Sequence, residues 1–268
     1  MIKLIASDMD GTLLNDRKEL PGDFFEVFDE LERRGIKFTV ASGRSFDAVA
    51  HLFPEEYRTR LDFICDNGAN VIHEGKQVSV TPLDRPTFEQ LIRACEDIGG
   101  LRILVCAGRG TYRLTADAEF SAEIAKYYKN HIPCDDLLSV DDVIYKLAVC
   151  DMKGTQQHAK PAIDAIFGDR LNVQVSGPIW MDVMGAGVSK GSALRALGKH
   201  LGISADDTMA FGDFYNDADM LKYAGWSFAM ENGNPDIKRM TRFLARSNNE
   251  NGVLRAIRQY ALQEDSIK

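Results

Sequence analysis

The sequence predicts an α/β protein with a Rossmann-like parallel-sheet core and an inserted α+β cap domain. Strand-like and helix-like segments alternate up to residue 65 and again after residue 189, which is typical of a parallel sheet covered by helices. Between these stretches, hairpins and helices are mixed, which favours a separate α+β unit. A chain of 268 residues is long enough to bury a core in each.

The first part of the core begins with a short buried strand. The apolar run IKLIA at 2–6 ends in acidic residues and Gly11, which indicates a strand followed by a loop. Phenylalanine and leucine side chains at helical spacing then predict a helix that ends at Gly35. The remaining elements of this part are a strand at 36–41, a helix at 45–53 and a strand at 62–65.

The middle of the chain has a different pattern. Glu74 and Gly75 lie between two alternating segments, so we expect a hairpin across 71–80. The elements expected next are a helix at 87–98, a strand at 102–107, a turn at 108–110 into another strand, a helix at 120–131, a strand at 145–151, a helix at 158–167 and a hairpin across 173–184.

The last part returns to regular alternation. We expect a helix at 189–201, a strand at 208–211, a helix at 217–223, a strand at 226–230, a helix from 235 and a final helix at 252–262. The predicted domains are therefore a core made of residues 1–82 and 187–268, and a cap made of residues 83–186, which we expect to determine substrate specificity.

Composition narrows the choice of partner and compartment. A net charge of −8 and a pI of about 5.2 argue against nucleic acid as the main partner. No run reaches the roughly 18 apolar residues of a membrane span, and the N-terminus does not resemble a signal peptide. The five cysteines form no C-x-x-C pair and the histidines are scattered, so we expect reduced thiols, a cytoplasmic location and no zinc site.

Four polar clusters follow core strands or begin a core helix. They are DMDGT from Asp8, SGR from Ser42, SKG from Ser189, and GD followed by ND, which contains Asp213, Asn216 and Asp217. Ligands of open parallel sheets bind beyond the carboxyl ends of the strands, so we expect these clusters to meet at one edge.

The DMDGT cluster carries the chemistry of phosphoryl transfer. Asp8 is placed to act as a nucleophile, because a carboxylate can attack phosphorus and form an aspartyl-phosphate. If the backbone stays extended, the side chain of Asp10 points the same way and can act as general acid and base. Gly11 permits a tight turn after the strand.

Crowded carboxylates at this edge would repel one another and an incoming phosphate. Mg²⁺ suits such an oxygen-only set better than zinc does, so we expect a magnesium site among Asp8, Asp10 and Asp213, with Asp217 as a further candidate. Ser42 and Gly43 can bind phosphate at a helix N-terminus, and Lys190 is expected to stabilise both the phosphate and the nucleophile. Residues 185–191 (GAGVSKG) match no nucleotide-binding motif.

In this order, the motifs resemble those of the haloacid dehalogenase (HAD) superfamily, and specifically of its Cof-like phosphatases. The resemblance covers the whole chain through DMDGTLL, ASGR, DNGA, SKGSAL, GDFYNDADML and AMENGNPDIK. It implies that Asp8 is the nucleophile and a Mg²⁺ ligand and that Asp10 is the general acid and base. It also implies that Asp10 binds the metal through its backbone carbonyl and that Asp213 is the other protein ligand.

The same resemblance implies a set of phosphate contacts and a residue that orients one of them. Asp217 would orient Lys190 or a metal-bound water. Arg44 and Asn67 match positions near the site, and Tyr215 could narrow the entrance, contact a leaving group or serve packing. The implied phosphate contacts are the Met9 backbone, Ser42, Gly43, Lys190 and Asn216.

The function expected from these residues is Mg²⁺-dependent hydrolysis of small phosphorylated metabolites, with sugar phosphates as candidates. A phosphomutase or phosphotransferase is the first alternative, since the same core can return phosphate to a second hydroxyl group. A non-catalytic phosphometabolite-binding module is the second, although a pure binder needs no acid at Asp10. Cap residues such as Arg109, Tyr112 and Trp180 are candidates for leaving-group contacts or for scaffold. No nucleic-acid or membrane partner is expected.

Overall fold

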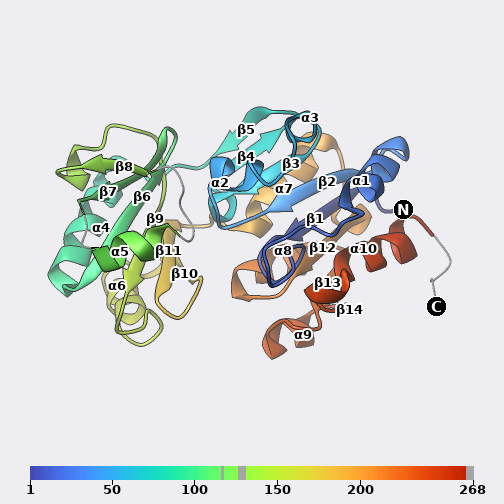
Figure 1. Ribbon diagram of the computed structural model, residues 1–268. Coiled ribbons are helices and arrows are strands. Elements are labelled where there is room, and N and C mark those ends of the chain that lie inside the picture. The colour runs from blue at the N-terminus through green and yellow to red at the C-terminus, as the bar shows by residue number, and fades with distance from the viewer. Residues whose placement is uncertain (116–117, 126–130, 264–268) are drawn as a thin grey trace.

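The computed structural model describes residues 1–115, 118–125 and 131–263, and within them the chain forms two β-sheets that lie side by side (Figure 1). The larger sheet has eight strands in the order β14-β13-β12-β1-β2-β3-β4-β5, and the smaller has six in the order β10-β11-β9-β6-β7-β8. The mixed α/β architecture with a parallel core confirms the predicted fold class.

The larger sheet is parallel except at one edge, where β4 and β5 run antiparallel. Because β1 lies between β2 and β12, segments from the two ends of the chain become neighbours in the middle of the sheet. The strands are β1 (Leu4–Asp8), β2 (Lys37–Ala41), β3 (Asp62–Cys65), β4 (Asn70–His73), β5 (Lys76–Val80), β12 (Thr208–Gly212), β13 (Trp226–Met230) and β14 (Phe243–Ala245).

Both faces of this sheet are buried, as expected of a parallel sheet covered by helices. Ile5 packs with the phenylalanines of α1 in one hydrophobic cluster, whereas Leu4 and Ala6 pack with α7 and α8 in another. This alternation explains why IKLIA is continuously apolar. The helices of this half are α1 (Phe24–Arg33), α2 (Phe46–Ala50), α3 (Glu55–Arg58), α7 (Lys190–Leu201), α8 (Ala218–Tyr223), α9 (Pro235–Met240) and α10 (Gly252–Ala256).

The smaller sheet has its own hydrophobic core. Helices α4 (Arg85–Ile98) and α6 (Ala159–Phe167) pack on one face, and α5 (Ala118–Ile124) packs on the other. We call this half of the molecule the cap. Its strands are β6 (Leu101–Ala107), β7 (Gly110–Leu114), β8 (His131–Cys134), β9 (Ile144–Asp151), β10 (Leu171–Val175) and β11 (Trp180–Gly185).

The chain passes from the larger sheet to the cap between Val80 and Arg85, and it returns between Gly185 and Lys190. The domain boundaries after residues 82 and 186 stay a prediction.

Four elements of the structure differ from the expectation. The helix expected at 120–131 is wrong at its end, because α5 ends at Ile124 and His131 begins β8, while residues 126–130 lie outside the described part. β8 escaped prediction because it is a short edge strand that contains Pro133, a residue tolerated at sheet edges. The expected final helix ends in a π-helical turn at Ile257–Ala261, and the three-residue strand β14 was not predicted.

Two further features of the described residues are the state of the cysteines and the ability of the helices to span a membrane. All five cysteines are free, four of them buried and Cys134 half-buried. No helix in these ranges combines the length and the apolar character that crossing a membrane would require.

Candidate active site

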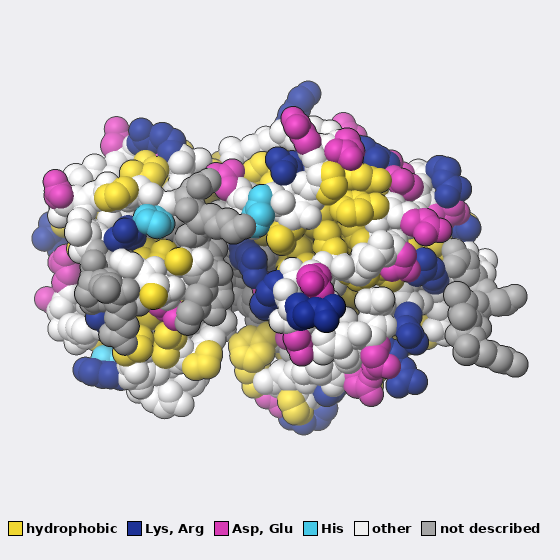
Figure 2. Space-filling model, viewed as in Figure 1, with side chains coloured by type: hydrophobic (Ala, Val, Ile, Leu, Met, Phe, Trp, Pro, Cys, Tyr) yellow, Lys and Arg dark blue, Asp and Glu magenta, His cyan; other side chains and the backbone are white. Residues whose placement is uncertain are grey.

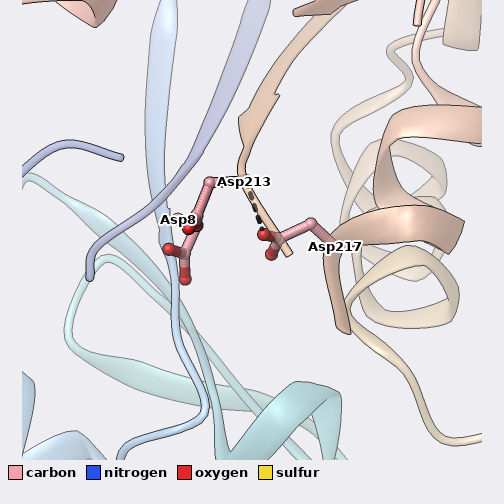
Figure 3. A group of neighbouring side chains, drawn as sticks. All are labelled: Asp8, Asp213 and Asp217. Atoms are coloured by element: carbon pink, nitrogen blue, oxygen red, sulfur yellow. Dashed lines mark hydrogen bonds between the residues drawn. The ribbon is translucent and has the colours of Figure 1, made fainter. Parts of the chain in front are cut away.

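Three carboxylates meet at the carboxyl edge of the larger sheet (Figure 3). Asp8 is the last residue of β1, and Asp213 directly follows β12, the parallel neighbour of β1. Asp217 lies four residues further on, just before α8. Each contributes a carboxylate oxygen, and these oxygens lie within 4.8 Å of one another.

Lys190 lies behind these carboxylates and joins two of them. Its Nζ donates to Asp8 Oδ1 at 2.6 Å and to Asp217 Oδ1 at 2.7 Å, and the side chain is fully buried. Ser189 caps α7 by accepting a hydrogen bond from the backbone N–H three residues on, which fixes where the helix begins. A Cβ at Gly191 would lie 2.4 Å from the backbone of α8, so glycine permits the helix contact that brings Lys190 to Asp217.

The loop that carries Asp213 is held from two sides. Asp217 Oδ2 accepts hydrogen bonds from the backbone N–H groups of Asp213 and Phe214, at 3.0 and 3.1 Å. Thr12 Oγ1 donates to Asp213 Oδ1 at 3.1 Å. Gly11 has φ +81°, and a Cβ there would lie 2.6 Å from Asp213 Oδ2, so this turn requires glycine for both conformation and space.

Asp10 lines the same cavity as Asp8, but not for the predicted reason. The backbone does not stay extended, because β1 ends at Asp8 and the chain turns. Arg44 donates to the two Asp10 carboxylate oxygens at 2.8 and 2.6 Å, and Lys18 donates at 2.8 Å. Burial raises the pKa of Asp10, but the two cations outweigh burial and leave the pKa below its usual value.

The pKa values of the clustered carboxyl groups shift in the opposite direction. Burial raises the pKa of Asp8 well above its ordinary value, and the ammonium of Lys190 only partly opposes this. Burial and the charge of Asp217 raise the pKa of Asp213 to about 6. A surplus of negative charge adds to the effect of burial, because one ammonium faces three carboxylates.

The donor set therefore fits a hard divalent cation. Carboxylate oxygens at this spacing match the preference of Mg²⁺, and a charge of +2 would offset the surplus. Both oxygens of Asp217 already accept hydrogen bonds, so Asp8 and Asp213 are the better-placed ligands.

Three of the expected phosphate-binding residues, Ser42, Gly43 and Asn216, lie on two loops that Asn67 joins. The Asn67 N–H donates to the Ser42 carbonyl at 3.1 Å, and Asn216 Nδ2 donates to Asn67 Oδ1 at 3.2 Å. Gly43 lies so close to the Asn67 amide that a Cβ would approach it to 3.1 Å. The side chain of Met9 is buried in the hydrophobic core, so only its backbone is available to a ligand.

A cavity of about 680 Å³ joins these residues to the cap. Figure 2 shows a groove between the two halves of the molecule with Lys and Arg side chains on its core side, where Lys18 and Arg44 line the cavity. The core contributes Asp8, Asp10, Lys18, Ser42, Gly43, Arg44, Asp213, Phe214 and Asn216, and the cap contributes Glu123, Lys146, residues 176–179, Trp180 and Asp182.

Not every candidate from the sequence lies at this cavity. Trp180 lines it, whereas Arg109 and Tyr112 both bond Asp142 in the cap, which is a scaffold arrangement. Tyr215 is half-exposed, and its hydroxyl donates to Asp236 at 2.6 Å, so it contacts α9.

Three charged cap residues at the cavity were missed. Lys146 and Asp182 are single charges within the apolar strand runs IYKLAV and WMDVM, and a charge in a buried strand is the signal that could have identified them. Glu123 lies on α5 and carries no comparable signal.

Known proteins share these features over the whole chain. The family model for haloacid dehalogenase-like hydrolases matches residues 5–257. A 5-amino-6-(5-phospho-D-ribitylamino)uracil phosphatase of Escherichia coli, YbjI, is 31% identical over 258 residues, which cover 96% of this chain and 95% of that protein. An HMP-PP phosphatase of Klebsiella pneumoniae is 28% identical over a region that covers 89% of this chain and 87% of that protein.

The solved structures agree in fold. The crystal structure of SMU.1108c from Streptococcus mutans has a TM-score of 0.89 and 28% identity, covering 98% of this chain and all of its own. The motifs, the carboxylate cluster and these similarities lead to one conclusion: the chain belongs to the haloacid dehalogenase-like hydrolases and is a Cof-type phosphatase of that family.

Proposed function

We propose that this phosphatase is Mg²⁺-dependent and hydrolyses small phosphorylated metabolites through an aspartyl-phosphate on Asp8. The observation that carries the proposal is the buried contact of Asp8 with Lys190 at the wall of a cavity that the cap closes. A carboxylate held in this way has a fixed direction of attack, and the cavity has room for a metabolite.

The residues that would hold Mg²⁺ are Asp8, Asp213 and the backbone carbonyl of Asp10. The chemistry that the ion supplies when bound is neutralisation of the repulsion between the Asp8 carboxylate and the substrate phosphate. The raised pKa values of Asp8 and Asp213 support this, since burial and neighbouring carboxylates disfavour their ionised forms and Lys190 opposes this only in part.

In the first step, an oxygen of Asp8 forms a bond to phosphorus while the bond from phosphorus to the leaving oxygen breaks. Lys190 favours the ionised form of Asp8, and the phosphate is bound by the Met9 backbone, Ser42, Gly43, Lys190 and Asn216. Arg44 and Lys18 favour the ionised form of Asp10, so Asp10 takes up a proton from solvent when it leaves these cations and then gives that proton to the leaving oxygen.

In the second step, Asp10 takes a proton from water, whose oxygen attacks phosphorus and releases Asp8 and orthophosphate. To reach the leaving oxygen, the carboxyl group of Asp10 has to exchange Arg44 and Lys18, which now bond it, for the substrate.

The substrates that we propose are small phosphate esters of hydroxylated metabolites, sugar phosphates among them. Phosphorylated ribitylaminopyrimidines are one candidate class, because such a compound is the named substrate of the E. coli relative. We propose the cytoplasm as the compartment, which the free thiols support, and no nucleic-acid or membrane partner.

The test is hydrolysis of p-nitrophenyl phosphate by the purified chain and by Asp8→Asn, with Mg²⁺ present. Asparagine keeps the shape but is a poor nucleophile, so we expect activity to fall by at least about a thousandfold. Asp97→Asn, an exposed change on α4, is the control. Retained activity in Asp8→Asn would eliminate the mechanism. Conversion of a hexose phosphate into its isomer without orthophosphate would instead favour a mutase.

A further inference from the structure

The cap contributes a buried ion pair to the phosphate-binding side of the core. Lys146 on β9 and Asp182 on β11 are 2% and 4% exposed, and Lys146 Nζ donates to Asp182 Oδ1 at 2.7 Å. The same ammonium donates to the carbonyl of Gly43 at 2.7 Å. A cap side chain thus fixes the peptide group that follows Gly43, on one of the loops expected to bind phosphate.

Asp182, the other member of the ion pair, is linked through Asn67 to the loop that carries Asn216. Asn67 Nδ2 donates to Asp182 Oδ2 at 2.7 Å, and Asn67 Oδ1 accepts from Asn216 Nδ2 at 3.2 Å. Gly43 and Asn216, which lie on opposite loops of the core, are therefore connected to the same cap ion pair, one directly and one through Asn67.

Fold stability alone does not explain these charges. Removing two charges from water costs several kcal/mol per ion, and apolar side chains of similar volume often serve stability as well or better. The neighbouring strand residues Leu147, Ala148, Met181 and Val183 are fully buried hydrophobic side chains, as this position would ordinarily require. The charges are instead directed at the core loops.

We propose that Lys146 and Asp182 are positioning residues through which the cap sets the loop of Ser42 and Gly43 and the Asn216 amide against the substrate phosphate. The phosphate subsite is then complete only when the cap is seated as it is here. This inference rests on the proposed function for the identity of the subsite. It concerns the phosphate rather than the leaving group, so it applies to every phosphate ester that the enzyme accepts.

The informative variant is the double substitution Lys146→Met with Asp182→Met. It removes both charges together and leaves neither buried alone, so the cap should stay folded. It also removes the donor to Gly43 and the acceptor for Asn67. The matched control is Asp151→Asn, which alters a buried carboxylate on the same strand that bonds His158 within the cap.

We expect the double variant to keep the melting temperature of the control within a few degrees. Its dissociation constant for inorganic phosphate, measured by calorimetry with Mg²⁺ present, should rise about tenfold, a usual size for coupling between sites. KM should rise by a similar factor for p-nitrophenyl phosphate and for acetyl phosphate, with a smaller change in kcat. Asp182→Asn, which keeps the shape of the side chain, should show the same trend to a lesser degree.

Unchanged phosphate affinity and KM in a folded double variant would overturn the proposal. A rise in KM confined to one substrate would also overturn it, because the pair would then contact the leaving group. Failure of both the double variant and Asp182→Asn to fold would overturn it as well, because the pair would then serve the fold. Because phosphate binding is measured without turnover, this result is independent of the Asp8→Asn test. A chain that binds phosphate through the pair but does not hydrolyse esters would refute only the proposed function.

Discussion

Three consecutive residues after β3 have left-handed backbone conformations, with φ of 51° at Asp66, 54° at Asn67 and 105° at Gly68. A Cβ at Gly68 would lie 2.2 Å from the carbonyl oxygen of Ser189, so only glycine permits this approach to α7. Asparagine is among the residues that best tolerate this conformation. The turn aims the Asn67 amide at Asn216 and Asp182. It also buries Asp66, and neither carboxylate oxygen of Asp66 has a hydrogen-bond partner among the residues that the structure describes.

Asp66→Asn should make the protein more stable at neutral pH. Burial raises the pKa of Asp66 to about 7; Lys146 opposes this shift, and Asp182 and Asp47 add to it. Between its ordinary pKa of 3.8 and about 7, the folded chain keeps a proton that the unfolded chain loses, so stability falls as pH rises through this window. Asparagine has no such proton and suits the backbone conformation.

The measurement is thermal unfolding from pH 5 to pH 8. The melting temperature of Asp66→Asn minus that of the parent should increase with pH and be positive by several degrees at pH 8. Asp97→Asn, at an exposed position, is the control for loss of one negative charge. A difference that stays constant with pH would show that Asp66 is not the group responsible.

At the scale of elements, the site depends on the order of strands. Asp8 and Asp213 are 205 positions apart, yet β1 and β12 are parallel neighbours, with Ser7 opposite Phe211. Because the two strands run in the same direction, each of them places a carboxylate at the same edge of the sheet. The N-terminus of α7 then brings a lysine, where the helix dipole disfavours a cation, and the carboxylates of Asp8 and Asp217 compensate.

This arrangement predicts opposite effects of Asp213→Asn with and without Mg²⁺. In a chelator, the variant should melt at or above the temperature of the parent, because one of the clustered carboxylates is gone. With millimolar Mg²⁺, the parent should gain several degrees and the variant little, since a ligand that binds only the folded state stabilises it. Equal Mg²⁺ shifts in both proteins would place the cation elsewhere; Asp97→Asn should behave like the parent.

At the scale of the whole molecule, two separately packed halves both line the cavity at the carboxylate cluster. Each sheet has its own hydrophobic core, and the contact between the halves combines polar bonds with a small apolar cluster that includes Ala69, Tyr145 and Met184. In the proposed mechanism the reacting groups come from the core, and the cap supplies the wall that would face a leaving group. Selectivity for the leaving group would then depend on a different sheet from the one that carries the reacting groups.

Ile179→Ala tests this division of roles. Ile179 lines the cavity from the loop between β10 and β11, so its loss should weaken contact with a bulky leaving group. We expect KM for p-nitrophenyl phosphate to rise about three- to tenfold, as for loss of a few methylene contacts, and KM for acetyl phosphate to stay within about twofold. Val143→Ala, an exposed aliphatic change in the cap, is the control. Equal effects on both substrates would contradict the assignment.

Much of the fold follows from local rules. Alternation and apolar runs predicted nearly every strand and helix of the parallel core, because side-chain periodicity reports burial directly. The rule that parallel strands present their carboxyl ends at one edge predicts that Asp8, Lys190, Asp213 and Asp217 meet there, as they do in the structure. β8 and β14 were missed because short edge strands carry little periodic signal.

What the sequence determined by itself is the order of elements and the set of groups at the sheet edge, since both depend on neighbours along the chain. Only the tertiary structure decided the direction of each side chain and its partners. The Asp10 carboxylate binds Arg44, and Lys146 reaches Gly43 across 103 positions of sequence. The physical reason is that a hydrogen bond needs its atoms within about 3 Å, and the packing of two sheets fixes such distances between residues that no local pattern relates.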